Sequence, residues 1–321
     1  MGFSLVSIVL CQYVVINTAK GIQMTWTTST LSSTDDWNCI AYGNGQFVTI
    51  ANASIASSYS SNGITWTGGN VADDVYSPYN VTTHAYWQDV IYAKDRFVAI
   101  SIGFTSASSI DGVRWNQRPL PYSKKWQGIA YGQNFHITVG SGYVTKFGFP
   151  HGNQAVAVTP DPHDWSSSVM DTSLPWVDVA FGNTKFIAIA ANTNAVSTST
   201  HGASWITSNT LPVTQNWSSI IYGNNAFVAV ATGSSTATYS NDGITWTATT
   251  LPAAQNWVDI AYGNNQYVAI ASNSSMAAVS ADGVTWTASI MPVDQDWSAI
   301  AYGENKFIAV ANNSNTAAIL N

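Results

Sequence analysis

Charge is scarce in this sequence. Charged side chains make up 8% of the 321 residues, whereas about a quarter of the residues in an ordinary globular protein are charged. The net charge of −7 argues against a nucleic-acid partner, because such a partner needs a basic surface. Ser, Thr, Asn, Gly and Ala replace the missing charges, a composition typical of all-β proteins outside the reducing cytoplasm or of viral particles. We therefore expect a virion or extracellular location.

Cysteine and histidine are also rare. The two cysteines, Cys11 and Cys39, have no metal-ligand spacing, and they either form a bridge or, as we expect, remain free thiols. The five histidines show no H-x-x-x-H pair, and the sequence contains no G-x-S-x-G, phosphate-loop or dinucleotide-binding pattern. The sequence predicts no metal, no cofactor and no enzyme activity.

Long hydrophobic runs are missing as well. The apolar segment at residues 3–16 is too short for a membrane-spanning helix and lacks the basic start of a secretory signal. Its Val, Ile, Leu and Tyr residues favour strands. We predict no membrane span and a β arm at residues 1–17, which either adds a hairpin or docks onto a neighbouring subunit.

Tryptophan, by contrast, is abundant and periodic. One series opens segments of the form W-x-x-I-A-Y-G, and a second series closes segments that end in D-G-x-T-W or a degenerate version of it. The two series contain all 14 tryptophans, so the chain repeats itself seven times. The opening residues are Trp37, Trp87, Trp126, Trp176, Trp217, Trp257 and Trp297, and the closing residues are Trp26, Trp66, Trp115, Trp165, Trp205, Trp246 and Trp286.

Each repeat has the alternation of short strands. In the last repeat Ile300 and Tyr302 share one face of a strand, and Asn-rich or D-G turns separate the strands. Four strands in about 40 residues is the period of a propeller blade. We predict an all-β fold, a seven-bladed β-propeller of four-stranded antiparallel blades at residues 18–321. An aromatic residue follows the Tyr of the Y-G pair by five positions in nearly every repeat, whereas Phe135 follows by four, and this spacing supports the count of seven.

The first and last repeats are incomplete. The sequence starts with the closing Trp26 and ends after the opening Trp297. We predict that residues 297–321 supply three strands of a blade and residues 18–29 supply the fourth. Strands from both ends would then share one blade, close the ring and remove exposed sheet edges.

The turn before the closing tryptophan resembles the Asp-box of sialidase-like propellers. The string S-x-D-G-x-T-W stands at residues 240–246 and 280–286, one residue shorter than that family's pattern between Asp and Gly. In that family the box is a structural turn between outer strands, so the resemblance implies a fold and not an activity. The repeats are also similar to those of phage virion proteins and of bacterial secreted or surface proteins.

The resemblance does not extend to the sialidase active site, which uses three arginines from different blades and a tyrosine paired with Glu. The three arginines here, Arg96, Arg114 and Arg118, lie in one repeat, and the single Glu304 lies in a turn. These positions cannot converge on the ring axis. The sequence therefore lacks the residues of that site.

Three aspartates remain as candidates near the axis. Asp89, Asp178 and Asp259 each follow an opening tryptophan by two residues, on the innermost strands of alternate blades. We expect their carboxylates to accept backbone hydrogen bonds or to be solvated at the channel mouth. A metal site or an acid/base pair is the alternative.

Two repeats carry insertions. Trp66 and Trp87 are 21 positions apart instead of the usual 11, and Trp126 and Trp165 are 39 apart instead of 28 or 29. Because antiparallel strands reverse direction, both insertions leave the ring on the same face. Aromatic and basic residues on loops of a rigid scaffold indicate a recognition surface, unless the long loops only cover neighbouring blades. The candidate partner- or glycan-binding residues are Tyr76, Tyr79, Arg118, Lys124, Lys125, Lys146, Phe149 and His151.

These observations favour a non-catalytic structural or binding propeller of a phage virion or extracellular assembly. Its expected partners are other virion or surface-assembly proteins or a host glycan. The alternative is a lectin-like propeller, which would keep polar residues constant in every repeat, whereas the constant residues here are apolar. A sialidase-like glycoside hydrolase ranks third.

Overall fold

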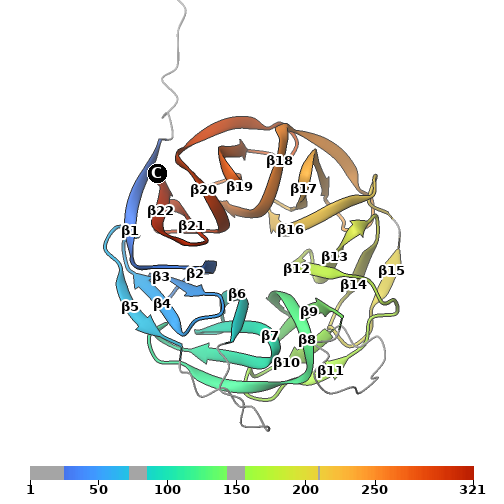
Figure 1. The fold of residues 1–321 in the computed structure, drawn as a ribbon. Helices are drawn as coiled ribbons and strands as arrows, with labels where there is room; N and C mark the ends of the chain where they lie inside the picture. Colours follow the sequence, from blue (N-terminus) through green and yellow to red (C-terminus); the bar gives the residue numbers. More distant parts are fainter. Residues whose placement is uncertain (1–24, 72–84, 143–155, 209) are drawn as a thin grey trace, which may run out of the picture.

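The computed structural model describes residues 25–71, 85–142, 156–208 and 210–321. Every regular element in these ranges is a β-strand, so the all-β prediction is confirmed. None of the described residues forms a helix that could cross a membrane. The predicted arm at residues 1–17 lies outside the described residues. Figure 1 shows the strands arranged as a ring of small sheets around a central axis.

Two repeats have four separate strands. In each of them the chain runs from an innermost strand outward, and every strand pairs antiparallel with the next. The first set is β2 (Trp37–Gly43), β3 (Gln46–Ala51), β4 (Ala56–Ser60) and β5 (Thr67–Asn70), and the second is β12 (Trp176–Gly182), β13 (Lys185–Thr193), β14 (Val196–Ser199) and β15 (Ile206–Ser208).

Elsewhere the strands continue through the connections. Three long strands run from the outer edge of one repeat into the innermost position of the next, and three others join the second and third positions of one repeat. The strands of these repeats are β6 (Tyr86–Ala93), β7 (Arg96–Ser109), β8 (Asn116–Gly132), β9 (Phe135–Ser141), β10 (Val156–Thr159), β11 (Ser166–Ser168), β16 (Gln215–Gly223), β17 (Ala226–Ser240), β18 (Thr247–Gly263), β19 (Gln266–Ser280) and β20 (Thr287–Gly303).

The two ends of the described chain pair with each other. β1 (Trp26–Asp35) lies antiparallel to β22 (Ser314–Leu320), which pairs in turn with β21 (Lys306–Ala311). Trp26 is opposite Leu320 in this ladder, and its indole N–H donates to the Ser289 hydroxyl on β20 at 2.9 Å. Figure 1 shows β1 (blue) as the outer strand beside β22 (red).

Short asparagine-rich turns join the first and second strands. Asn264 and Asn265 have φ angles of 48° and 57°, and Asn224 and Asn225 have φ angles of 45° and 58°. Asn tolerates this left-handed region better than most residues, and two such residues in succession suit a tight hairpin. The N-N dipeptides therefore fix the register of the inner hairpins.

The tryptophans form the core, as the repeat predicts. All seven opening tryptophans are fully buried, and Trp66, Trp115, Trp205 and Trp246 of the closing series are also buried. Burying a side chain of this size removes about 150–250 Å² from water. Each repeat thus brings its own large apolar anchor to the contact with its neighbour.

The repeat that begins at Trp126 departs from the aromatic series. In this repeat the position equivalent to Phe227 is occupied by His136 and not by Phe135. His136 pairs with Tyr131 as Phe227 pairs with Tyr222, with 4.7 Å between the ring centroids in both cases. The spacing along the strand decides which of the two side chains is buried, because successive strand residues point to opposite faces of the sheet. The His136 side chain has an exposed fraction of 0%, and burial lowers its pKa to about 4.

The Y-G pairs set the packing between repeats. A Cβ added to Gly263 would lie 2.0 Å from Cγ of Tyr302 in the next repeat, and one added to Gly303 would lie 2.0 Å from Cγ of Tyr42. Each glycine is thus the surface on which the next aromatic ring rests. The contact between Gly303 and Tyr42 joins β20 to β2, which are far apart in the sequence.

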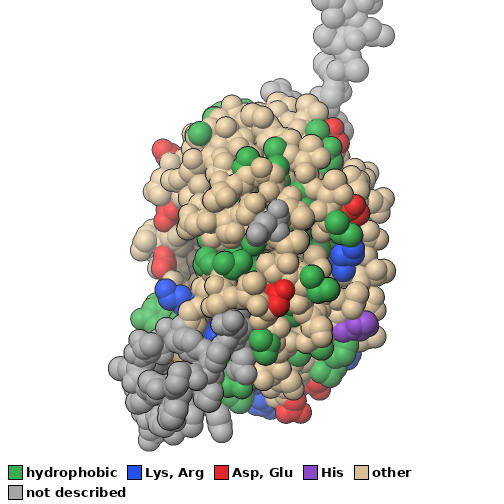
Figure 2. Space-filling model, turned by 90° about the vertical axis from the view of Figure 1, so that its right-hand side faces the viewer, with side chains coloured by type: hydrophobic (Ala, Val, Ile, Leu, Met, Phe, Trp, Pro, Cys, Tyr) green, Lys and Arg blue, Asp and Glu red, His purple; other side chains and the backbone are tan. Residues whose placement is uncertain are grey.

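The outer surface carries few charges. Figure 2 shows one side of the molecule, on which uncharged polar side chains dominate and Lys, Arg, Asp and Glu are scattered. The exposed large apolar residues include Ile206, Ile244 and Ile290. Such isolated exposed apolar residues are ordinary on a folded protein.

Candidate functional site

Three carboxylates lie on the innermost strands, as predicted. Asp89 is on β6, Asp178 on β12 and Asp259 on β18. The other four repeats have small side chains at this position, so carboxylates and small residues alternate along the chain from the first repeat to the last. These residues are Cys39, Gly128, Ser219 and Ala299.

Each carboxylate joins its strand to the next repeat. One oxygen accepts the N–H of the following residue, and the other accepts a backbone N–H of the neighbouring innermost strand. For Asp178 these donors are Val179 at 2.7 Å and Ile220 at 2.8 Å. For Asp259 they are Ile260 and Ile300, both at 2.8 Å. The prediction that these groups accept backbone hydrogen bonds is confirmed.

Asp89 follows the same rule, with Val90 at 2.7 Å and Ile129 at 3.0 Å as donors. A serine adds a link between the other two carboxylates, because the Ser219 hydroxyl lies 3.1 Å from Oδ2 of Asp178 and 2.9 Å from Oδ1 of Asp259. The three carboxylates therefore act first as clamps between repeats.

Burial makes these carboxyl groups weaker acids than an exposed aspartate. It raises the pKa of Asp178 to about 7 and that of Asp259 to about 6. The pKa of Asp89 is raised well above its ordinary value by burial and then by the charge of Asp178. Burial also raises the pKa of the Cys39 thiol, helped by the nearby Asp89. No three His, Cys, Asp or Glu side chains in the described ranges are grouped as a metal ion would require.

We expect stability to fall as pH rises through this range. An unfolded Asp has a pKa of about 3.9, so Asp178 binds its proton more tightly in the folded state. The stabilisation is complete below about pH 4 and is lost as pH rises through 7. Between pH 6.5 and 8 the loss from Asp178 is roughly 1 kcal/mol, which corresponds to about 2–4 °C in Tm.

The control for this prediction is Asp178→Asn, measured by calorimetry at the same pH values. It is expected to flatten the pH dependence of Tm above pH 6.5. His136 works in the opposite direction, because its folded pKa of about 4 lies below the unfolded value of about 6.5. Its effect extends slightly above pH 6.5 and is the same in both chains, so the difference between them isolates Asp178. A slope equal to that of the wild-type chain would show that Asp178 does not carry the effect.

A second group of residues lies on one face of the ring. The connection face is the face on which the loops between second and third strands and the connections between repeats emerge. On this face Tyr86 of β6 and Lys125 of β8 both pair with Ile102 of β7, the strand between them. Tyr86 is 51% exposed, Phe104 in the adjoining bend is 37% exposed, and Lys125 is exposed. We call Tyr86, Phe104 and Lys125 the attachment surface.

The attachment surface differs from the other repeats. The residue before the opening tryptophan is aromatic only at Tyr86, and among the second-to-third connections within the described ranges only the one with Phe104 contains an aromatic residue. The equivalents of Tyr86 are Asp36, Lys125, Pro175, Asn216, Asn256 and Asp296. Sequence reasoning missed Tyr86 and Phe104, although alignment of the repeats would have singled them out.

The structure separates the predicted binding residues. Lys125 is exposed on the connection face, whereas Lys124 beside it is 4% exposed, and burial lowers its pKa. Arg118 lies within the outer strand part of β8, half-buried, and donates to the Gln117 carbonyl at 2.8 Å. The remaining candidates, Tyr76, Tyr79, Lys146, Phe149 and His151, lie outside the described residues.

The fold and these sites define a β-propeller. The DUF6242 beta propeller domain model matches residues 152–318, and the chain belongs to this family. No curated protein matches the sequence significantly.

Solved structures show the same architecture at low identity. Virginiamycin B lyase from Staphylococcus aureus is 11% identical, with a TM-score of 0.76 over 93% of this chain and 99% of that one. YCF48 from Cyanidioschyzon merolae is 15% identical, with a TM-score of 0.67 over 92% and 98% of the two chains. A structure of YCF48 bound to D1 peptide is 13% identical, with a TM-score of 0.70 over 92% and 96%. These likenesses concern the fold.

Proposed function

We propose that this chain is a seven-bladed, non-catalytic β-propeller that binds a partner protein of a virion or extracellular assembly through its connection face. The count of seven is supported by the innermost strands. Each contains one opening tryptophan and contacts the next strand of the series, and the last contacts the first. In order they are β2, β6, β8, β12, β16, β18 and β20.

Closure of the ring by both ends is part of the proposal. It is supported by the ladder between β1 and β22 and by two contacts between β20 and β2. The Ser298 hydroxyl donates to the Trp37 carbonyl at 2.5 Å, and the Tyr42 hydroxyl donates to the Glu304 carboxylate. The Ser298 bond has the same form as the bond from the Ser218 hydroxyl to the Trp257 carbonyl at 2.8 Å, which joins two other neighbouring repeats.

We assign an Asp-box-like role to the D-G turns. The Ser240 hydroxyl accepts the Gly243 N–H at 2.8 Å and donates to Asp242, whose carboxylate accepts the N–H groups of Ile244 and Thr245 at 2.8 Å. These bonds lower the pKa of Asp242 to about 2. One oxygen of the carboxylate, Oδ1, accepts all three of these bonds and holds the turn, which favours a structural role.

The hydrogen bonds of the three axial carboxylates, Asp89, Asp178 and Asp259, support the proposal that the propeller is not catalytic. All three spend both oxygens on backbone N–H groups of neighbouring strands. A general acid or nucleophile would have to give up one of these bonds to reach a substrate. The geometry favours clamps between blades over reacting groups.

The attachment surface is the observation that carries the binding role. Two exposed aromatic rings and an exposed lysine lie on three neighbouring strand segments, and no other repeat has an aromatic residue before its opening tryptophan. Aromatic side chains are enriched at the centre of protein interfaces. The structure of YCF48 bound to D1 peptide shows that a similar propeller binds a peptide in that protein, which supports a protein partner here.

We expect the variant with serine at Tyr86, Phe104 and Lys125 to bind isolated particles or cell surfaces of the source organism at least tenfold more weakly. Loss of one aromatic anchor of an interface costs about 2 kcal/mol or more, and 1.4 kcal/mol is a factor of ten in Kd. Binding is measured by sedimentation of labelled protein at low and high salt. The contribution of Lys125 should decrease with salt.

The matched control is a variant with serine at Ile206 and Ile244, which are exposed away from the attachment surface. It should bind as the wild-type chain does. Both variants should keep the wild-type Tm, because their substitutions lie on the surface. Equal binding by the two variants would place the binding role elsewhere, with the predicted arm at residues 1–17 as the next candidate.

A further inference from the structure

A serine lies between two of the carboxyl groups at the ring axis. The Ser219 hydroxyl on β16 is 2.9 Å from Oδ1 of Asp259 on β18 and 3.1 Å from Oδ2 of Asp178 on β12. Ser219 is 5% exposed, and the two aspartates are partly shielded from solvent between the innermost strands. We call these three residues the axial bridge, because they join three neighbouring innermost strands.

The axial bridge needs more hydrogens than the serine can supply. A hydroxyl has one hydrogen, so it donates to one group, and an ionised carboxylate has none to offer in return. The backbone N–H groups that bond to the two aspartates contribute no hydrogen to the serine. With both aspartates ionised, one of the two contacts would bring together two oxygens with no hydrogen between them. A proton on either carboxyl group satisfies both contacts.

The axial bridge occurs once among the described innermost strands. Gly128 lies between Asp89 and Asp178, and a Cβ added there would lie 2.6 Å from Oδ1 of Asp178, so no side chain fits. Asp259 and Asp89 are separated by two repeats, with Ala299 and Cys39 at the equivalent position and no hydroxyl. Ser219 is therefore the one residue at this position that links two carboxyl groups in the described part of the chain.

The surroundings of the axial bridge disfavour two negative charges. The residues that pair with its members on the second strands are apolar and have an exposed fraction of 0%: Ile189, Val230 and Ile270. The other titratable groups that interact with the described axial aspartates are acidic, Asp89 on β6 and Cys39 on β2. Burial raises the pKa of Asp178 and of Asp259, and the charge of Asp259 raises that of Asp178 further.

We propose that Asp178, Ser219 and Asp259 share one proton and form a pH-sensitive junction between β12, β16 and β18. With the proton present, one carboxyl group donates to the serine, and the serine donates to the other carboxylate. Loss of the proton to solvent leaves two anions and one hydrogen, so the serine releases one of them and the junction loosens. The proton belongs to the pair and not to one aspartate. This device is independent of the attachment surface and adds to the role of each aspartate as a clamp.

The test is an infrared titration of the full chain, which follows the C=O stretch of protonated carboxyl groups between about pH 4.5 and 9. Exposed aspartates are ionised above about pH 6, so the band that remains reports shielded carboxyl groups, and Asp89→Asn identifies the share of Asp89. Ser219→Ala introduces the residue of the last repeat. It should weaken the hold on the shared proton about tenfold, which lowers the apparent pKa by about 1. The protonated form loses two hydrogen bonds, whereas the ionised form loses one.

Ala299→Ser tests the sign of the effect. It adds a hydroxyl at the equivalent position of β20, with Asp259 on one side and no carboxyl group on the other. This hydroxyl can only donate to a carboxylate, so it should also lower the apparent pKa. A Ser219 hydroxyl that merely donates predicts opposite signs, because its removal would raise the pKa. A raised or unchanged pKa in Ser219→Ala therefore overturns the proposal.

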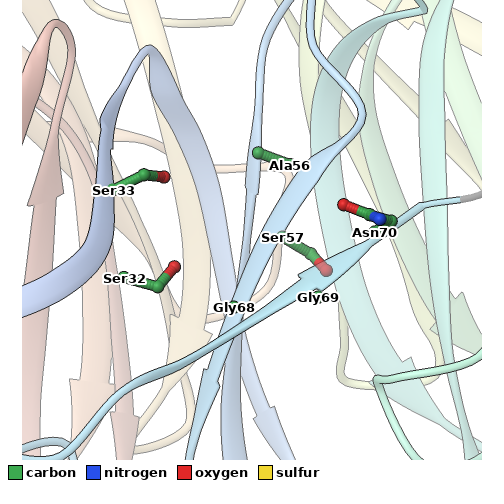
Figure 3. Close-up of a pocket in the computed structure, with 7 residues that line it drawn as sticks. All are labelled: Ser32, Ser33, Ala56, Ser57, Gly68, Gly69 and Asn70. Atoms are coloured by element: carbon green, nitrogen blue, oxygen red, sulfur yellow. The ribbon is translucent and has the colours of Figure 1, made fainter.

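Ser57→Ala is the matched control for loss of a buried serine. Ser57 is 1% exposed, and its hydroxyl has no hydrogen-bond partner. Figure 3 shows it with Ser32, Ser33, Ala56 and residues 68–70, none of which is ionisable. The titration of this variant should match that of the wild-type chain. A pKa lowered as far as in Ser219→Ala would also overturn the proposal, because the effect would not depend on the axial bridge.

Discussion

Deletion of residues 1–28 is expected to lower Tm by at least about 10 °C and to cause association at micromolar concentration. The deletion removes Trp26 and the part of β1 that pairs with residues 318–320 of β22. Ile319 and Leu320 are buried in the intact chain, and their strand would become a free edge. Loss of a large core side chain costs about 3–5 kcal/mol, and each kcal/mol corresponds to about 2–4 °C in a chain of this size.

Deletion of residues 1–24 is the control, because it leaves β1 intact. The difference in Tm between the two truncations measures the contribution of the paired strand. Size-exclusion chromatography should show a monodisperse control and a larger species for the longer deletion, as exposed edges promote association. Equal Tm values for the two truncations would refute closure of the ring through both ends.

The parts of the fold that follow from local pattern could be predicted from the sequence. The alternation around Ile300 and Tyr302 and the N-N turns depend on neighbouring residues only. The pairing of β1 with β22 followed from counting incomplete repeats. The tryptophans were assigned to the core because apolar rings of that size are rarely left in water.

The sequence is harder to interpret where the strand period and the residue type indicate different residues for the same position. Phe135 is the aromatic residue of its repeat, but the strand period gives the core position to His136. Only its position in the repeat identifies His136 as the residue whose imidazole replaces a phenyl ring. Lys124 and Lys125 read alike in the sequence, and only the strand geometry shows that one is buried and the other exposed.

The candidate sites needed three-dimensional register. The aspartates could be placed on innermost strands, but their bonds to the next repeat depend on how neighbouring strands are offset. The buried, unpaired hydroxyl of Ser57 was not predicted, because a serine opposite a glycine is ordinary in a sequence. It becomes informative once the pairing shows Ala or Val at the sister positions.

The packing of repeats leads to a prediction for Gly263. Gly263→Ala places a Cβ about where the Tyr302 ring now lies, 2.0 Å from its Cγ. Both strands are innermost and held by pairing on β19 and β21, so neither can move away without breaking ladder bonds. Overpacking of this kind costs about 3 kcal/mol. Tm should therefore fall by about 6–12 °C.

Gly68→Ala is the control for the general effect of adding a methyl group to a strand glycine. Its Cβ would meet the Ser32 side chain at 3.4 Å, an ordinary contact, and removal of a strand glycine is neutral or slightly stabilising. Calorimetry of both variants separates the clash from backbone propensity.

The double variant Gly263→Ala with Tyr302→Ala tests the cause of the loss. Tyr302→Ala alone should be destabilising because it removes a ring that packs on Gly263 of the preceding repeat. In the double variant the Gly263→Ala substitution should cost almost nothing further, since the ring it strikes is gone. Additive losses would mean that Gly263 is needed for a reason other than the Tyr302 ring, whereas a coupling of about 2–3 kcal/mol identifies the ring-on-glycine contact as what sets the spacing between blades.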